Sequence, residues 1–170
     1  MCGLNKTMIK KFLVIIGLVL LVIVLLVIVL LGVLRFVKSM QENNMENQYS
    51  QIKEVCFEKK CFNVEVVEGL ADKAKGLMER ESLAENSGML FLYNQERVIS
   101  IWTKNMKIPI DVIWLNKDLE VVYLVENAQP CLTEKCESFK PETKAQYILE
   151  INAGQIQQND VQLGHKAELN

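Results

Sequence analysis

Residues 12–34 read FLVIIGLVLLVIVLLVIVLLGVL, and these 23 uncharged residues divide the chain into two parts. A helix of this length rises about 34 Å at 1.5 Å per residue, which spans a hydrocarbon core about 30 Å thick. A helix that is apolar on every face is hard to bury in a chain of 170 residues, and a lone strand in lipid would leave its backbone unpaired. The stretch therefore predicts one transmembrane helix ahead of a single domain.

The apolar stretch is longer than the core of a cleaved signal peptide, which runs about 7 to 15 residues before a small-residue cleavage site. Residues 35–40, RFVKSM, contain no such site. We therefore expect an uncleaved anchor that contacts the lipid bilayer through residues 12–34.

The distribution of charge predicts the orientation of this anchor. Three lysines and the amino terminus precede it, whereas only Arg35 and Lys38 follow it closely. The positive-inside rule then places residues 1–11 in the cytoplasm and the C-terminal domain outside it, in a single-pass protein of the cell membrane. Beyond residue 38 the chain carries 14 basic and 21 acidic side chains. A domain that acidic argues against a nucleic-acid partner.

A polar segment separates the anchor from the domain. Residues 39–51 contain no proline or glycine and few apolar side chains. We expect residues 35–53 to form a solvated stalk or a frayed continuation of the helix, and residues 54–170 to form the folded domain.

Within the domain the pattern predicts an α+β fold with a mainly antiparallel sheet, either curved or closed into a small barrel, and one or two short helices. Residues 71–80, ADKAKGLMER, predict a helix of three turns at most. Short runs of β-branched and aromatic residues predict strands. These are residues 61–68, 88–93, 98–103, 110–115, 120–125, 144–151 and 161–169.

Four cysteines form two pairs of equal spacing, Cys56 with Cys61 and Cys131 with Cys136. Four cysteines allow three disulfide connectivities, and spacing does not choose among them, although each pair could close across its own polar turn. The predicted orientation favours disulfides, with a structural zinc site as the alternative and free thiols if the orientation is inverted. Cys2, ahead of the anchor, is expected to be a free thiol.

Four strings carry a resemblance to a known family: GLMER at 76–80, GMLF at 88–91, WTKNMKIPID at 102–111 and YILEINAG at 147–154. In this order and spacing they resemble the domain of unknown function 192 family, also called uncharacterised protein family 0127. That family shows GLM-x-R, GMLF, WMKNT-x-IPLD and YVLE-x-x-AG strings. The resemblance covers roughly residues 61–164 and implies a compact β-rich domain, often behind an anchor or signal sequence, with no established activity.

Several positions depart from the family strings. Thr103 stands where the family usually has methionine, and Met106 stands where it has threonine. Residues 159–160, Asn-Asp, replace a Gly-Asp pair, and the loop around residues 138–139 lacks a common tyrosine. The resemblance therefore carries no site onto these positions.

Asp111 is a carboxylate inside an apolar run, so if buried it must be paired or hydrogen-bonded. One hypothesis is a polar cluster that lines a ligand pocket. The ligand-binding candidates are Arg80, Trp102, Lys104, Asn105, Asp111 and Glu150. The structural alternative is that Asp111 caps a turn or accepts backbone amides, while Arg80 pairs with a carboxylate that holds the predicted helix against the sheet.

Nucleophilic and metal chemistry find few candidates. His165 is the single histidine, so a Ser/His or Cys/His system, or a metal site of histidines and carboxylates, has no second histidine. The sequence contains no phosphate-binding glycine loop. We expect no metal and no cofactor, and we assign no catalytic residue.

Three functions follow from these features. The first is a non-enzymatic extracytoplasmic module that binds a small envelope ligand or a membrane protein. The second is an envelope hydrolase that uses Asp111 and Glu150 as acid and base, which requires both carboxylates in one cleft about 5–10 Å apart. The third is a structural subunit of a membrane complex.

Overall fold

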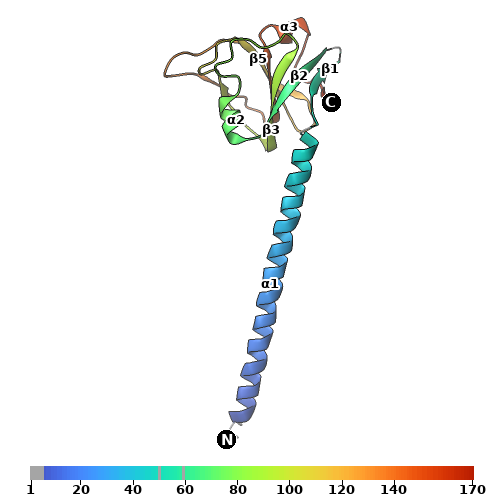
Figure 1. Ribbon diagram of the computed structural model, residues 1–170, viewed down its shortest axis with the longest axis vertical. Coiled ribbons are helices and arrows are strands. Elements are labelled where there is room, and N and C mark those ends of the chain that lie inside the picture. The colour runs from blue at the N-terminus through green and yellow to red at the C-terminus, as the bar shows by residue number, and fades with distance from the viewer. Residues whose placement is uncertain (1–5, 50, 59) are drawn as a thin grey trace. The chain divides into compact units, whose positions relative to one another are not determined.

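The computed structural model describes residues 6–49, 51–58 and 60–170, so Cys2 and the rest of residues 1–5 lie outside the described residues. The chain separates into two compact units, one that ends at Gln48 and one from Tyr49 to Asn170. The described part of the first unit is helix α1, Lys6–Tyr49, except for its last residue (Figure 1). Within its segment Ile15–Gln41, the most apolar stretch of 18 residues has a mean hydropathy of 3.6 and no buried residues. By length and composition this helix can cross a membrane, a property that signal sequences share.

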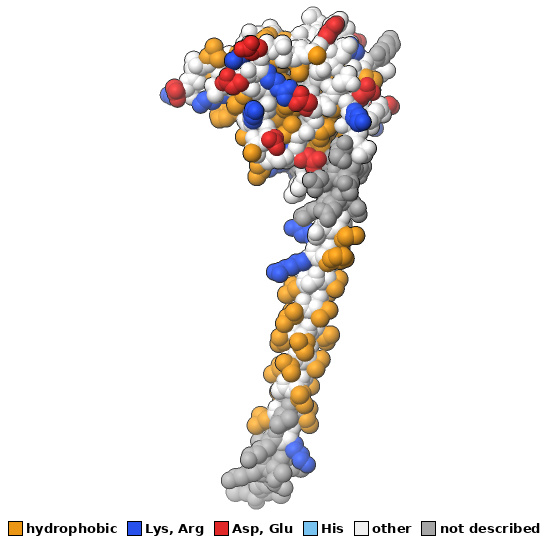
Figure 2. Space-filling model, in the orientation of Figure 1, with side chains coloured by type: hydrophobic (Ala, Val, Ile, Leu, Met, Phe, Trp, Pro, Cys, Tyr) orange, Lys and Arg blue, Asp and Glu red, His pale blue; other side chains and the backbone are white. Residues whose placement is uncertain are grey.

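Hydrophobic side chains surround the described apolar part of α1 (Figure 2). The helix also continues through the polar residues that we assigned to a stalk, as far as Tyr49.

The second unit is built on a curved, mixed sheet with the strand order β6-β5-β8-β3-β2-β1-β9. Its strands are β1 Glu54–Phe57, β2 Lys60–Val67, β3 Ser87–Arg97, β5 Ile110–Leu115, β6 Val121–Ala128, β8 Ala145–Asn152 and β9 Ala167–Leu169. Among the described strands β2 and β3 form the one parallel pair, because helix α2, Leu70–Lys75, connects them. The predicted α+β class with a mainly antiparallel sheet is confirmed.

The sheet forms a half-barrel whose two edges meet at one end. Glu120, just before β6, forms an isolated bridge with Lys166, just before β9. The amide of Val121 donates to the His165 carbonyl at 2.8 Å, and the amide of Ala167 donates to the Leu119 carbonyl at 2.9 Å. These bonds satisfy part of the exposed backbone at both edges.

Side chains on the two faces of the sheet pack into separate clusters. The inner face holds Phe62, Leu90, Ile113, Leu149 and Ile151, which pack against strands on the other side of the half-barrel. The outer face holds Phe91, Val112, Trp114 and Ile148, and the segments that cover it contribute Leu77, Ile99 and Met106. Because successive side chains in a strand alternate between faces, the central strands are apolar on both sides.

Several elements differ from their predicted bounds. The helix predicted over 71–80 ends at Lys75, because Gly76 has a φ of +50° that a right-handed helix does not adopt. The strand predicted over 98–103 is only β4, Ile101–Trp102, which pairs with β7, Ser138–Phe139. The strand predicted over 161–169 is only β9. The short elements β1, β7 and α3, Gln155–Gln158, had no sequence pattern strong enough to predict them.

Candidate functional site

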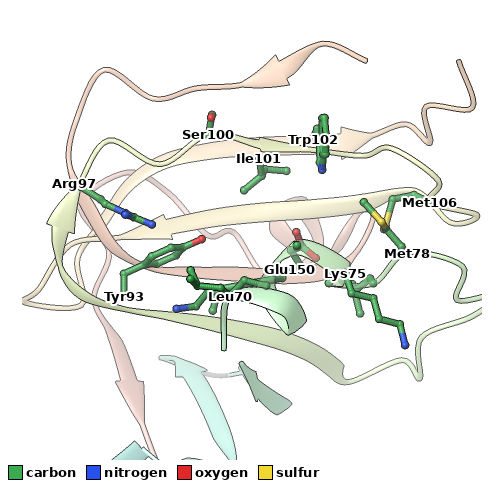
Figure 3. A pocket seen from close by; sticks show the side chains of 15 residues that line it. Leu70, Lys75, Met78, Tyr93, Arg97, Ser100, Ile101, Trp102, Met106 and Glu150 are labelled. Atoms are coloured by element: carbon green, nitrogen blue, oxygen red, sulfur yellow. The ribbon is translucent and has the colours of Figure 1, made fainter. Parts of the chain in front are cut away.

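A pocket of about 230 Å³ lies on the outer face of the sheet, where α2, β3 and β4 come together (Figure 3). Its apolar lining includes Leu77, Met78, Phe91, Trp102 and Met106. The Trp102 side chain stands at the rim and is half exposed, whereas Phe91 and Met106 are buried. The pocket therefore combines aromatic rings and thioethers with access from solvent.

Glu150 lies at the floor of this pocket. It is opposite Met89 in the β3–β8 register and opposite Val112 in the β5–β8 register, which puts its side chain on the outer face. The residue is only 6% exposed, and its carboxylate points into the pocket in Figure 3. Across the described ranges it receives no side-chain hydrogen bond and forms no ion pair. Burial alone raises the pKa of Glu150 to about 8, so the carboxyl is mostly protonated at neutral pH.

The mouth of the pocket is basic. The Lys73 ammonium lies 4.4 Å from the centre of the Tyr93 ring, and the Arg97 guanidinium lies 4.7 Å from it. Burial lowers the pKa of Lys73, and the neighbouring Arg97 lowers it further. Burial raises the pKa of Tyr93, while Arg97 opposes that shift and Glu150 adds to it. Arg97 and the buried acid thus shift the pKa of the same tyrosine in opposite directions.

Asp111 lies on the other side of the sheet. It is opposite Ile151, one position from the pair formed by Val112 and Glu150, so its side chain joins the inner face. The Asp111 carboxylate is fully buried and accepts the amide of Asn127 at 2.8 Å and the amide of Ile156 at 2.7 Å. Ile156 belongs to the first turn of α3, whose N-terminal amides need an acceptor. Asp111 therefore holds backbone in place, as the structural alternative described.

This placement corrects the acid–base hypothesis. That hypothesis required Asp111 and Glu150 in one cleft, but the two carboxylates project from opposite faces of the sheet. The pair cannot act together on one substrate.

The remaining candidates divide between the pocket and its surroundings. Arg80 forms a two-pronged ion pair with Glu65, both contacts at 2.5 Å, in a neighbouring groove. The Lys104 ammonium lies 5.7 Å from the Trp102 ring, outside the pocket lining. Asn105 has a φ of +56° and uses its backbone carbonyl to accept the amide of Glu79 at 3.0 Å. Of the six candidates, Trp102 and Glu150 meet in the pocket.

The basic residues at the mouth of the pocket were not among the predicted site residues. Tyr93 lies two residues after the GMLF string, and Arg97 lies at the end of β3, four residues beyond the predicted end of that strand. Lys73 lies in the predicted helix. The available signal was an aromatic residue, Tyr93, with a cation four residues after it and another cation 20 residues before it.

The profile of DUF192, described as Uncharacterized ACR, matches residues 53–169. The chain belongs to the DUF192 family. A comparison with curated proteins finds no match.

Two solved structures resemble this DUF192 chain. One is a protein of unknown function from Novosphingobium aromaticivorans DSM 12444, with a TM-score of 0.64 and 30% identity over 69% of this chain and 84% of that one. The other is a proposed transcription regulator from Sinorhizobium meliloti 1021, with a TM-score of 0.62 and 27% identity over 68% of this chain and 90% of that one.

Two glycines of the DUF192 strings stand where a side chain would be crowded by neighbouring atoms. A Cβ added at Gly76 would lie 3.3 Å from the Phe91 ring, at a backbone angle that side chains rarely adopt. A Cβ added at Gly88 would lie 2.8 Å from the Glu150 carbonyl oxygen. Glycine therefore lets β3 approach β8 and lets the chain turn sharply beside the Glu150 carboxylate.

The cysteines of this DUF192 domain pair across their own turns. Cys56 bonds Cys61 between β1 and β2, and Cys131 bonds Cys136 in the loop before β7. Within the described residues, Glu54, Cys56 and Cys61 have potential metal-ligand atoms within 4.8 Å of one another. Disulfide sulfurs offer no thiolate, so this group does not suit the zinc alternative. Two disulfides indicate an oxidising compartment.

Thr103 and Met106, two departures from the family strings, lie beside the pocket. The Thr103 hydroxyl donates to the Gln129 carbonyl at 2.7 Å, and its own carbonyl accepts the amide of Cys131 at 3.0 Å. Met106 is buried in the pocket wall. The hydroxyl gained at Thr103 thus ties the segment after β4 to Gln129, two residues before the disulfide loop, while the bond to Cys131 is made by the backbone alone.

Proposed function

We propose that this DUF192 protein is a non-enzymatic binding module that takes a small ligand into the pocket above Glu150. The observation that supports it most strongly is a buried carboxyl without a hydrogen-bond partner among the described residues, aimed into an apolar pocket. Within the described residues no fully enclosed side-chain oxygen or nitrogen lacks a partner, so the Glu150 oxygens are open to the pocket, where a ligand can reach them.

We further propose that α1 anchors the module in the cell membrane, with residues 1–11 in the cytoplasm and the domain outside it. The apolar length of α1, the lysines that precede it and the two disulfides support this arrangement. A protein partner in the membrane and a structural-subunit role stay predictions.

A thermal-shift screen of the full chain in nonionic detergent micelles tests the binding proposal. We expect at least one class among envelope glycans, peptides and metabolites to raise the unfolding temperature. Trp102→Ala is then expected to weaken binding at least tenfold, because the half-exposed ring lines the pocket without supporting the core. Leu163→Ala, which also trims an exposed apolar side chain but lies outside the lining, is the control. No stabilisation by any class would contradict the proposal.

Protease added to intact cells tests the orientation. We expect cleavage of the C-terminal domain without lysis. Protection of that domain until the cells are lysed would contradict an extracytoplasmic location.

A further inference from the structure

We propose that the ligand is a small zwitterion whose ammonium group contacts the Glu150 carboxylate and whose acidic group lies between Lys73 and Arg97. This inference rests on the proposed binding function and specifies the chemistry of the ligand. It predicts one positive and one negative group, joined by a short apolar segment that lies against Trp102, Met78 and Met106.

The floor of the pocket favours a cation. Glu150 is more than nine-tenths buried, and its carboxylate is directed toward the open space of the pocket (Figure 3). The rings of Phe91, Tyr93 and Trp102 line the same space, and aromatic faces attract ammonium groups. An ammonium supplied by the ligand would satisfy the carboxylate with charge-assisted hydrogen bonds.

The cationic side chains at the mouth of the pocket do not pair with Glu150. Lys73 and Arg97 both lie over the Tyr93 ring rather than in an ion pair with Glu150. In Figure 3 the Arg97 guanidinium and the Tyr93 ring lie side by side at one end of the pocket, and the Glu150 carboxylate lies farther in. None of the ion pairs in the described part of the chain neutralises the ionised form of Glu150, so an ammonium group of the ligand can supply that charge.

The mouth of the pocket favours an anion. Lys73 and Arg97 are like charges held at one ring, and Arg97 disfavours the charged form of Lys73. Glu68 favours the charged form of Lys73. A carboxylate or phosphate between the two cations would relieve their repulsion and accept hydrogen bonds from both.

The size of the pocket limits the ligand. Its volume of about 230 Å³ is below the roughly 300–1,000 Å³ of pockets for drug-sized molecules. A free metabolite of amino-acid size and the head group of a zwitterionic phospholipid share the required chemistry.

Isothermal titration of the full chain in nonionic detergent micelles provides the test, with four probes that share a six-carbon chain. 6-Aminohexanoate carries both charges, hexylamine only the ammonium, hexanoate only the carboxylate, and hexanol neither. We expect 6-aminohexanoate to bind most tightly. Glu150→Gln should weaken 6-aminohexanoate and hexylamine at least tenfold without weakening hexanoate.

The other end of the ligand has its own variant and control. Arg97→Gln should weaken 6-aminohexanoate and hexanoate about threefold or more and leave hexylamine unchanged. Arg80→Gln, which also removes a partly exposed guanidinium but from the neighbouring groove, should leave all four probes unchanged.

The pH dependence separates a cation site from a neutral acid site. Since burial raises the pKa of Glu150 to about 8, the carboxyl must lose its proton to bind an ammonium. Affinity for 6-aminohexanoate should therefore rise roughly tenfold from pH 6 to pH 7. The other titratable and charged groups that line the pocket with Glu150 are Lys73, Lys75, Tyr93 and Arg97.

The outcomes are distinguishable. Tighter binding of hexanol or hexanoate than of the two ammonium probes, or no effect of Glu150→Gln, would overturn the zwitterion while the binding function stands. If no probe binds and no ligand class stabilises the protein, both proposals fail.

Vesicles identify the source of the ligand. If vesicles of phosphatidylethanolamine displace 6-aminohexanoate and vesicles of phosphatidylglycerol do not, the zwitterion is a lipid head group. If neither displaces it, the zwitterion is a free metabolite. Displacement by phosphatidylglycerol alone would count against the ammonium site.

Discussion

Two carboxylates on neighbouring strands have opposite roles. Asp111 on β5 and Glu150 on β8 are one register position apart, and both are buried. The Asp111 side chain lies on the inner face and accepts hydrogen bonds from two backbone amides, whereas the Glu150 side chain lies on the outer face and projects into a pocket. Burial is thus common to both, and the groups that face each carboxylate decide whether it stabilises the fold or is available to a ligand.

Removal of the Asp111 carboxylate should have the largest effect on stability. Asp111→Ala should lower the free energy of unfolding by about 3–5 kcal/mol, because the amides of Asn127 and Ile156 lose their buried acceptor. Chemical denaturation of the full chain in micelles measures the change. Asp111→Asn keeps one acceptor oxygen and should cost less. A loss below about 1 kcal/mol for the alanine variant would contradict the structural role.

Removal of the ionisable carboxyl at Glu150 should instead raise the free energy of unfolding. The pKa of Glu150 is about 8 in the folded protein and ordinarily 4.5, so wild type loses stability as pH rises between these values. Relative to wild type, Glu150→Gln should gain about 1.4 kcal/mol per pH unit in this range, or roughly 3 kcal/mol at pH 7. The gain should be small at pH 5 and level off above pH 8.

Denaturation at pH 5, 7 and 9 checks this prediction. A difference between Glu150→Gln and wild type that does not change with pH would show that Glu150 is not a buried, unpaired acid.

Removal of either disulfide should have a smaller effect on stability. Replacement of both Cys131 and Cys136 by serine should cost about 2 kcal/mol and weaken ligand binding, because their loop is hydrogen-bonded to the segment after Trp102. The Cys56–Cys61 disulfide closes a loop of equal length. Replacement of both Cys56 and Cys61 by serine should cost a similar amount of stability without changing ligand affinity.

Denaturation and titration of both double variants measure these effects. Equal losses of ligand affinity in the two would contradict a role for the Cys131 loop in positioning the pocket wall.

Local sequence pattern was sufficient for the long elements of the sheet. β5 was predicted over 110–115 and is Ile110–Leu115, and β8 was predicted over 144–151 and is Ala145–Asn152. Their apolar, β-branched runs favour strands whatever surrounds them. β4 and β7 have two residues each and exist because they pair with each other. No local pattern identifies such a pair, since its stability comes from tertiary contacts.

The sequence by itself determined that a long apolar helix precedes one β-rich domain of the DUF192 type. The helix and the β-rich character follow from composition and local periodicity, and the family follows from the four strings that resemble it. The tertiary structure alone decided which carboxylate meets the pocket and which holds the backbone. The runs IDVIWL and YILEI are apolar on both sides, so neither strand has a polar face to mark its orientation. The register between β5 and β8 sets that orientation, and it depends on pairing between residues about 40 positions apart in the chain.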